Sequence, residues 1–264
     1  MTQPVCLTIA GLDPSGGAGI LADVRTFAAF GCFPAAAVTS ITFQNTVRVF
    51  GAEHQTADAV CRQVEPIIQD YTIAALKTGM LPTQEIIEET AALIKRMGGP
   101  RLVVDPVVRS TSGFDLIDDD ALRSLIKVLF PLADVVTPNL PEAERIAGFK
   151  ITSVDEIDKA AAAMQSMGAK NVLIKGGHLS DANIDSGQAT DYLYEGGARH
   201  LFSSDHIDTT ATHGTGCTLA AAITANLAIG KNLVDAIAIA KHFVTEAIRT
   251  SPMLGHGHSP INIR

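Results

Sequence analysis

Three short runs of branched apolar residues, each ending at or just before a polar residue, limit the folds open to this chain more than any other feature. They are Arg101–Asp105, Asp134–Pro138 and Asn171–Lys175. An unbroken apolar run of this length is typical of a strand buried on both faces, as the strands of a parallel sheet are. Helix-forming stretches alternate with such runs, so the sequence predicts an α/β/α sandwich with a mostly parallel central sheet.

The same alternation extends along the whole chain. We expect further strands over 5–10, 34–41, 47–55 and 73–80, and a hairpin of strands 189–194 and 199–203 around Gly196-Gly197. Helices are expected over 20–30, 56–70, 84–97 and 152–167, from about Pro141, and in two stretches near the end of the chain. Neither a tandem repeat nor a long linker interrupts this order, so we expect residues 1–264 to form a single domain.

Composition excludes several classes of protein. Apolar residues make up 47% of the chain and charged residues 18%, and the net charge is −8, which argues against a general nucleic-acid binder. Four scattered cysteines lack disulfide or metal-ligand spacing and suggest reduced thiols. Neither a signal peptide nor an apolar run of the ~20 residues that a membrane span needs is evident. We therefore expect a cytoplasmic protein without a membrane partner.

Polar residues follow the predicted parallel strands at what should be one edge of the sheet. Asp105, Lys175, and the pair Asn139 and Glu142 each follow a strand, and open α/β sheets bind ligands at their carboxyl edge. A lysine here is costly if unpaired and useful beside phosphates. Asn139 and Glu142 would suit a hydrated Mg²⁺, although a helix-capping interaction explains their spacing equally well.

The stretch His213–Thr218, sequence His-Gly-Thr-Gly-Cys-Thr, precedes a strong helix-forming run. The backbone of Gly214, Thr215 and Gly216, with the first N–H groups of that helix, would form a site for an anion such as a transferring phosphoryl group. Cys217 would lie in the first helical turn, where the helix field favours thiolate over thiol. The alternative is a glycine turn before a core helix, with an inert cysteine.

Residues 11–19 form a glycine-rich loop between the first strand and the first helix. They lack the Lys-Ser/Thr of a Walker loop, and alanine stands at position 37, where a dinucleotide fold needs an acid for the ribose. The loop is better interpreted as a lid or floor over a small ligand, with Asp13 and Asp23 as its polar groups; either could instead cap or decorate a helix.

Two side chains near other strand ends suit a flat, apolar ligand. Gln44 can both accept and donate hydrogen bonds to a heterocycle edge, although ordinary turn chemistry is the alternative. Met80 could line an apolar pocket, and a core role is as compatible with its spacing. Near the end of the chain, His256 and His258 have metal-like spacing, but two histidines without a third ligand are a weak site and we discount it.

With these residues in view, the chain resembles the hydroxymethylpyrimidine/phosphomethylpyrimidine kinases of thiamine biosynthesis, within the ribokinase-like superfamily. The resemblance covers nearly the whole chain and rests on eight motifs in the family's order. They are Thr8–Asp23, Gln44–Thr46, Lys77–Met80, Val104–Val107, Thr137–Ala143, Lys175–His178, His213–Thr218 and Gly255–His258.

The resemblance implies two successive ATP-dependent phosphorylations, first of the hydroxymethyl group and then of the monophosphate, by a homodimer. It further implies a role for each matched residue. Gln44 would bind the aminopyrimidine edge, Asp23 would lie near the hydroxymethyl oxygen, and Gly11, Ala18, Met80 and Val107 would wall the ring. Asn139 and Glu142 would serve Mg²⁺–ATP with Asp105 nearby, Lys175 would contact phosphates, Gly214–Gly216 would hold the transferring group, and Cys217 would be the base.

The sequence departs from the wider pattern at three positions. Many superfamily members have an aspartate base at the position of Cys217, and cysteine at this position is the pyrimidine-kinase pattern. Phe43 and Arg109 replace residues that are often smaller or apolar. Two other functions stay open. One is a pyridoxal-type vitamin kinase with the same chemistry, and the other is a non-catalytic regulator that binds the pyrimidine.

Overall fold

A computed structural model describes residues 3–108, 115–177 and 187–264. Its centre is a nine-stranded sheet in the order β3-β2-β1-β4-β5-β6-β7-β8-β9. The strands are β1 (Val5–Leu12), β2 (Phe33–Gln44), β3 (Val49–His54), β4 (Ile73–Thr78), β5 (Arg101–Val104), β6 (Val135–Val136), β7 (Val172–Lys175), β8 (Gln188–Glu195) and β9 (Ala198–Asp205). Strands β2, β1, β4, β5, β6 and β7 are parallel to one another. Strands β3, β8 and β9 are antiparallel to their neighbours.

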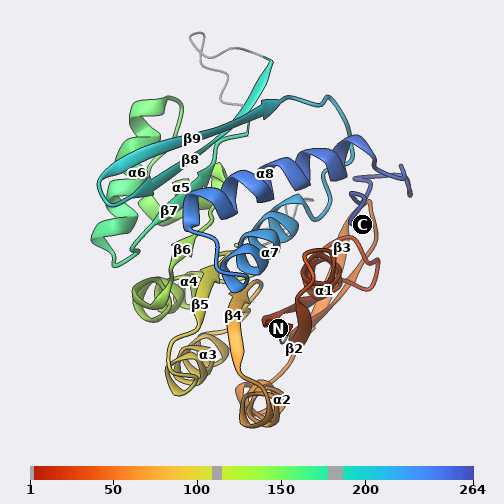
Figure 1. Cartoon of the computed structure of the whole chain (residues 1–264), viewed down its shortest axis with the longest axis vertical. Coiled ribbons are helices and arrows are strands. Elements are labelled where there is room, and N and C mark those ends of the chain that lie inside the picture. Colours follow the sequence, from red (N-terminus) through yellow and green to blue (C-terminus); the bar gives the residue numbers. More distant parts are fainter. Residues whose placement is uncertain (1–2, 109–114, 178–186) are drawn as a thin grey trace.

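Helices cover both faces of the sheet (Figure 1). One layer contains α1 (Gly19–Ala29), α7 (Thr215–Ala228) and α8 (Leu233–Arg249). The other contains α2 (Ala57–Asp70), α3 (Gln84–Arg96), α4 (Asp119–Val128), α5 (Leu140–Ala147) and α6 (Val154–Ser166), with a short 3₁₀ turn at Phe130–Leu132. The three-layer α/β/α architecture with a mostly parallel sheet is therefore confirmed.

The apolar runs owe their continuity to burial on both sides of the sheet. In β5, Leu102 and Val104 pack into the core under α2–α6, whereas Val103 packs into the core under α7 and α8, and all three are fully buried. Alternate side chains of one strand therefore serve two different cores, which explains why the run contains no polar position.

The helix that comes after the glycine motif is enclosed on every side. Residues 218–227 of α7 are all buried, because α7 lies between the sheet and its neighbours α1 and α8 (Figure 1). A helix enclosed in this way holds its first turn in a fixed position. That turn begins at the carboxyl edge of the sheet.

The structure also contains a helix that the sequence analysis did not assign. In α4, the Asp118 side chain accepts a hydrogen bond from the Ala121 N–H, and Ala121, Leu122 and Leu125 pack inward. The capping aspartate was an available signal, but the run of acids around it hid the short apolar face. The predicted hairpin is confirmed, with Gly196 and Gly197 at φ +57° and +83°, as a two-residue turn requires.

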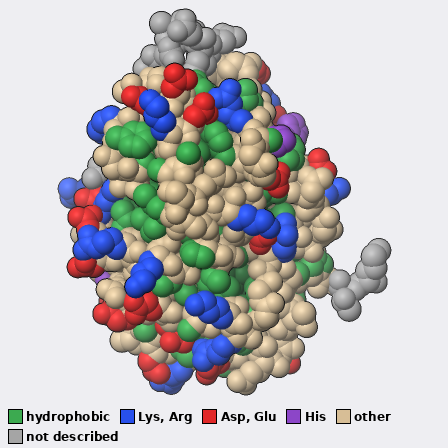
Figure 2. All heavy atoms as spheres, turned by 90° about the vertical axis from the view of Figure 1, so that its left-hand side faces the viewer, with side chains coloured by type: hydrophobic (Ala, Val, Ile, Leu, Met, Phe, Trp, Pro, Cys, Tyr) green, Lys and Arg blue, Asp and Glu red, His purple; other side chains and the backbone are tan. Residues whose placement is uncertain are grey.

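The surface carries acidic and basic side chains of both signs on the face that Figure 2 shows, where they are interspersed with apolar groups. Within the described residues, none of the helices is long and apolar enough to cross a membrane. The face in Figure 2 carries no extended patch of one charge.

Candidate active site

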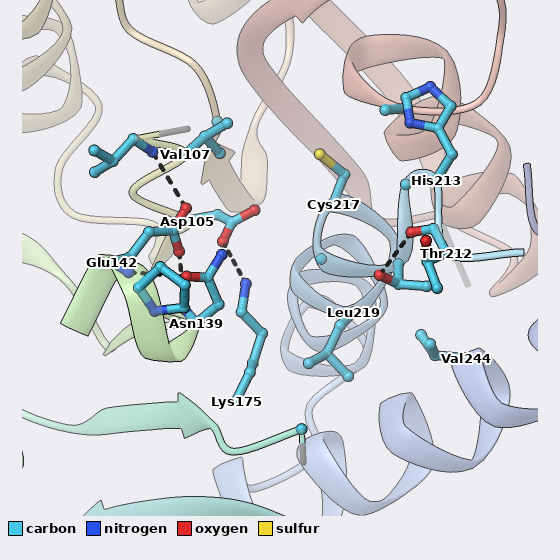
Figure 3. Close-up of a pocket in the computed structure, with 18 of the residues that line it drawn as sticks. Asp105, Val107, Asn139, Glu142, Lys175, Thr212, His213, Cys217, Leu219 and Val244 are labelled. Carbon is cyan, nitrogen blue, oxygen red and sulfur yellow. Dashed lines mark hydrogen bonds and ion pairs between the residues drawn. The ribbon is translucent and has the colours of Figure 1, made fainter. Parts of the chain in front are cut away.

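A cavity of about 1090 Å³ opens at the carboxyl edge of the parallel strands. It extends from the ends of β1, β2 and β4 to α8, and it passes the start of α7 (Figure 3). Its lining includes most of the predicted site residues: Gly11, Ala18, Gln44, Met80, Asp105, Val107, Asn139, Glu142, Lys175, Gly214, Thr215, Gly216 and Cys217. The shared carboxyl edge of the parallel strands thus brings these residues together at one site.

The two glycine loops meet over the centre of this cavity. Gly214, the N-cap of α7, has φ +86°, and a Cβ at this position would collide with the carbonyl oxygen of Gly17. Next to this contact, the ring Nε2 of His213 lies 2.7 Å from Asp13 Oδ2, and both side chains are buried. The loop before α1 is thereby joined to the loop before α7.

The start of α7 offers backbone donors to the cavity. None of the described side chains caps this helix, and the Thr215 hydroxyl donates instead to the Thr212 carbonyl at 3.0 Å. The N–H groups of the first turn, together with the helix dipole, make this end suitable for an anion. The structure therefore contains the feature on which the predicted phosphoryl site depends.

Cys217 corrects one expectation. We expected the helix start to lower the pKa of its thiol, but burial raises that pKa to about 11, even though the Lys77 ammonium and the Gly19 N–H favour the thiolate. The nearby carboxylates of Asp23 and Asp105 add to the increase. Desolvation of the charged form outweighs the helix field here, so the thiol is neutral near pH 7.

Asp23 also lies elsewhere than we expected. It is fully buried, its Oδ2 accepts hydrogen bonds from Lys77 Nζ at 2.8 Å and Thr8 Oγ1 at 2.6 Å, and it is not among the residues that line the cavity. Burial raises the pKa of its carboxyl despite the lysine. The Asp23 carboxyl is therefore not exposed to the cavity in the protein alone. Its partner Lys77, which sequence reasoning did not single out, borders the cavity, but the Lys77 side chain is itself fully buried.

A second lysine–aspartate pair opens into the cavity. Lys175, the last residue of β7, places Nζ 3.0 Å from Asp105 Oδ1, which also accepts a hydrogen bond from Thr137 (Figure 3). The carboxylates of Asp105 and Glu142 raise the pKa of the Lys175 amine despite its burial. A lysine that is always charged and faces a cavity beside an anion site is suited to bind phosphate oxygens.

Asn139 and Glu142 form the capping box that we considered as the alternative. The Asn139 side chain accepts from the Glu142 N–H at 2.9 Å, and Glu142 accepts from the backbone N–H groups of Asn139 at 2.9 Å and Val108 at 3.2 Å. Burial and the nearby Asp105 raise the pKa of Glu142 to about 7. Two carboxylates so close together favour a bound cation, which would stabilise their charged forms.

The end of the cavity near β2 is narrow and mostly apolar. Met80 Sδ would lie 3.1 Å from a Cβ at Gly11, so glycine is needed there for the methionine to cover the floor. Gln44 is half-buried at the end of β2, and within the described residues its amide has no hydrogen-bond partner. Val107 has φ +40°, a strained backbone conformation for a β-branched residue, which is consistent with a functional constraint on this wall.

The opposite end of the cavity contains residues that the sequence analysis missed. Leu219 of α7 and Val244 and Ile248 of α8 line an apolar slot near the helix start (Figure 3). The spacing of Val244 and Ile248 by one helical turn was the available signal, but on an amphipathic helix it also fits ordinary core packing. Arg109, one of the departures from the family pattern, lies outside the described residues, as does His178.

The chain matches the phosphomethylpyrimidine kinase family over residues 13–262. A hydroxymethylpyrimidine/phosphomethylpyrimidine kinase of Bacillus subtilis is 41% identical over 256 residues, which cover 97% of this chain and 93% of the relative. The crystal structure of a phosphomethylpyrimidine kinase from Clostridium difficile has a TM-score of 0.81 and 40% identity, and the match covers 93% of this chain and all of that one.

Pyridoxal kinases share the same architecture. The Staphylococcus aureus pyridoxal kinase in complex with AMP-PCP and pyridoxal has a TM-score of 0.90 and 33% identity, and the match covers 100% of this chain and 94% of that one. The cavity at the carboxyl edge therefore lies on a fold whose solved examples include nucleotide complexes. From the extent of the family match and the identity to its curated relatives, the chain belongs to the phosphomethylpyrimidine kinase family.

Proposed function

We propose that the protein transfers the γ-phosphoryl group of ATP to 4-amino-5-hydroxymethyl-2-methylpyrimidine and then to the resulting monophosphate, for thiamine biosynthesis. The observation that carries this proposal is the position of the anion site at the start of α7. It lies between the apolar slot of Leu219, Val244 and Ile248 and the narrow end that contains Gln44, within one cavity. A nucleotide and a small ring bound at the two ends would bring their reacting groups together at this helix.

The narrow end suits the pyrimidine. The Gln44 amide can pair with the amino group and ring nitrogen of the substrate, while Met80, Ala18, Gly11 and Val107 enclose its apolar faces. Asp23 would act on this ring only indirectly, through its ion pair with Lys77.

The other residues of the site would act on the phosphates. Lys175 and the backbone of Gly214–Gly216 would stabilise the charge that develops on the transferring group. Asp105 and Glu142, with Asn139 beside them, fit a hydrated Mg²⁺, which when bound would neutralise charge on the ATP phosphates. If they serve this ion, Glu142→Gln should raise the Mg²⁺ concentration needed for half-maximal rate.

Cys217 would accept the proton of the substrate hydroxyl. Its thiol is neutral near pH 7 in the protein alone, so only the minor thiolate form, which the Lys77 ammonium favours, would accept this proton. The transfer of the proton would come late, when the transferring phosphoryl group already draws charge from the oxygen. A loose phosphoryl transfer tolerates this order of events. In the second reaction the nucleophile is an ionised phosphate oxygen, which has no proton that must be removed.

The deciding experiment is incubation of the protein with Mg²⁺–ATP and the pyrimidine, with the products resolved by mass. The expected result is the monophosphate followed by the diphosphate, with stoichiometric ADP. Binding of the pyrimidine without any phosphorylated product would instead identify a non-catalytic regulator of this fold.

Pyridoxal is a second candidate substrate. The Staphylococcus aureus enzyme in complex with pyridoxal supports it, since that structure matches the whole of this chain. Pyridoxal and the pyrimidine both present a hydroxymethyl group on a flat heteroaromatic ring. Competition between the two in the same assay, with kcat/KM measured for each, decides which ring the narrow end prefers.

We further propose that residues 1–264 act as one cytoplasmic kinase domain that forms a homodimer. A single sheet spans the described chain. The large side chains of Phe43, Val47, Phe50, Met253 and Leu254 are exposed beside the edge strand β3, and apolar exposure on this scale is typical of an interface. Light scattering on the purified protein tests the dimer, and Phe50→Asp should yield monomers.

A further inference from the structure

The segment after α8, residues 251–263, lies beside β3 and α1 (Figure 1), and it contacts Thr212 and His213 of the cavity lining. We call it the C-terminal segment. Its first set of contacts is with the turn after β2, two residues beyond Gln44. The backbone N–H of His258 donates to the Thr46 carbonyl at 2.8 Å, and the N–H groups of His256 and Gly257 donate to the Thr46 hydroxyl oxygen at 3.2 and 3.3 Å.

Its second set of contacts is with the loop before α7. The His213 N–H donates to the Ser259 carbonyl at 3.2 Å, and the Ser259 N–H donates to the Thr210 carbonyl at 3.0 Å. The ring Nδ1 of His258 lies 2.9 Å from the Thr212 hydroxyl. The two residues His258 and Ser259 thus connect the turn at Thr46 with the loop that ends in the anion site.

Two glycines allow the segment to approach this closely. A Cβ at Gly255, which has φ +80°, would collide with the Thr46 side chain, and a Cβ at Gly257 would collide with the Thr46 carbonyl oxygen. The far end is anchored in the core. Ile261 and Ile263 are buried in a small cluster with Ala22, against which Cys217 also packs.

We propose that the C-terminal segment is a positioning element that fixes the turn after Gln44 relative to the loop before α7, which ends in the anion site. This inference rests on the proposed function, because it gives Gln44 and the anion site their roles. Near this turn Gln44 has only the edge strand β3 beside it, and residues 209–214 contain no helix or strand. Neither the turn after Gln44 nor residues 209–214 are held by the interior of the sheet. The C-terminal segment therefore links them, and it sets the distance between the bound ring and the transferring phosphoryl group.

Thr46 provides the sharpest test. Thr46→Val keeps the shape of the side chain but removes the acceptor for His256 and Gly257, whereas Thr46→Ser retains that acceptor. We expect Thr46→Val to raise the KM for the pyrimidine about tenfold and to lower kcat severalfold, with the KM for ATP within about twofold of wild type. Thr46→Ser should behave as wild type.

Hydrogen exchange provides a readout that does not depend on catalysis. In Thr46→Val the backbone amides of residues 209–217 should exchange faster than in wild type, while those of β5 remain unchanged. A role confined to local stability of the turn would speed exchange near Thr46 only.

A glycine pair gives an independent comparison. Gly257→Ala should produce the same changes in KM, kcat and exchange, because its Cβ would displace the Thr46 carbonyl. Gly51→Ala is the matched control on the neighbouring strand, where a Cβ would meet only the Phe43 ring at 3.4 Å.

The inference is overturned if Thr46→Val and Gly257→Ala leave exchange in residues 209–217 at the wild-type rate, or change the KM values for pyrimidine and ATP equally. The proposed function fails separately, if the wild-type protein forms no phosphorylated pyrimidine. The exchange comparison stays valid in that case.

Discussion

Two lysine–aspartate pairs lie near Cys217, and their surroundings differ. In the first, Lys77 and Asp23 are 2.8 Å apart and neither side chain is exposed. In the second, Lys175 and Asp105 are 3.0 Å apart, and the lysine side chain is 15% exposed to the cavity. The difference arises from the place of each lysine in its strand. Lys77 lies one residue before the end of β4, and the missing side chain of Gly79 leaves room for its Nζ, whereas Lys175 ends β7 beside the cavity.

This difference separates charge that holds the site together from charge that acts on a ligand. A sealed pair has no water to replace a lost partner, so its disruption should appear as instability. An open pair can exchange its partner for a phosphate oxygen, so its disruption should appear in the rate. Matched variants of the two pairs test that division.

The largest effect is expected for the sealed pair. Lys77→Met leaves the Asp23 carboxylate buried without its cation and should lower the free energy of unfolding by about 3–5 kcal/mol. Urea denaturation measures this loss. The double variant Lys77→Met/Asp23→Leu should recover a large part of this loss. If Lys77→Met alone is as stable as wild type, the sealed pair does not stabilise the fold as we expect.

Lys175→Met is the matched change in the open pair. It should lower the single-turnover rate of both phosphorylation steps about 10²–10³-fold, because both steps use the same ATP phosphates. Its cost in stability should be well below that of Lys77→Met. A rate loss confined to one step would show that Lys175 does not bind the shared phosphates.

Cys217 lies close to both pairs and is expected to separate the two steps. Cys217→Ala should slow the first phosphorylation about 10²-fold and the second step less, because only the first nucleophile has a proton to lose. Single-turnover rates for each step measure the difference. Equal losses would mean that Cys217 shapes the anion site, and no loss would make it an inert core residue.

Gln44 lies outside both pairs and should affect binding alone. Gln44→Leu leaves polar groups of the bound ring unpaired, at a cost of about 1–3 kcal/mol. The KM for the pyrimidine should rise accordingly while the KM for ATP and the free energy of unfolding stay near wild type. An unchanged pyrimidine KM would remove Gln44 from the recognition site.

The smallest effect concerns the reactivity of the thiol. Burial raises the pKa of Cys217 to about 11, and Lys77 is the cation that most opposes this increase. Alkylation by iodoacetamide should therefore rise with pH toward that value, and it should be severalfold slower in Lys77→Met than in Lys175→Met at the same pH. Equal slowing in both variants would indicate that the two pairs act alike on Cys217.

The fold could be predicted from the sequence because its strands are buried on both faces. Runs such as Leu102–Val104 have no polar position, and that property implies a parallel sheet with helices packed on both faces. The helix α4 escaped prediction because its apolar positions are few and its start is crowded with aspartates. Short elements carry too little periodicity to stand out.

The site was predictable where a residue ends a strand, as Asp105 and Lys175 do, since parallel strands share one carboxyl edge. The sequence did not distinguish Lys77 from Lys175, because only the loops packed over a strand end decide which lysine is sealed. The pKa of Cys217 was mispredicted for a related reason. Its helix position is local and visible in the sequence, whereas its burial depends on α1 and β4.

The hydrogen bonds that close the site join residues far apart in the chain. Asp13 and His213 are separated by 200 positions, and Thr46 and Gly257 by 211. Such contacts form only after the loops between them have closed, and they are therefore late events in folding. During refolding, the secondary structure of the sheet should return before enzymatic activity does, and the intermediate between them would have strands and helices but no assembled site. A partly folded chain of this kind exposes apolar surface and is the species most prone to aggregate.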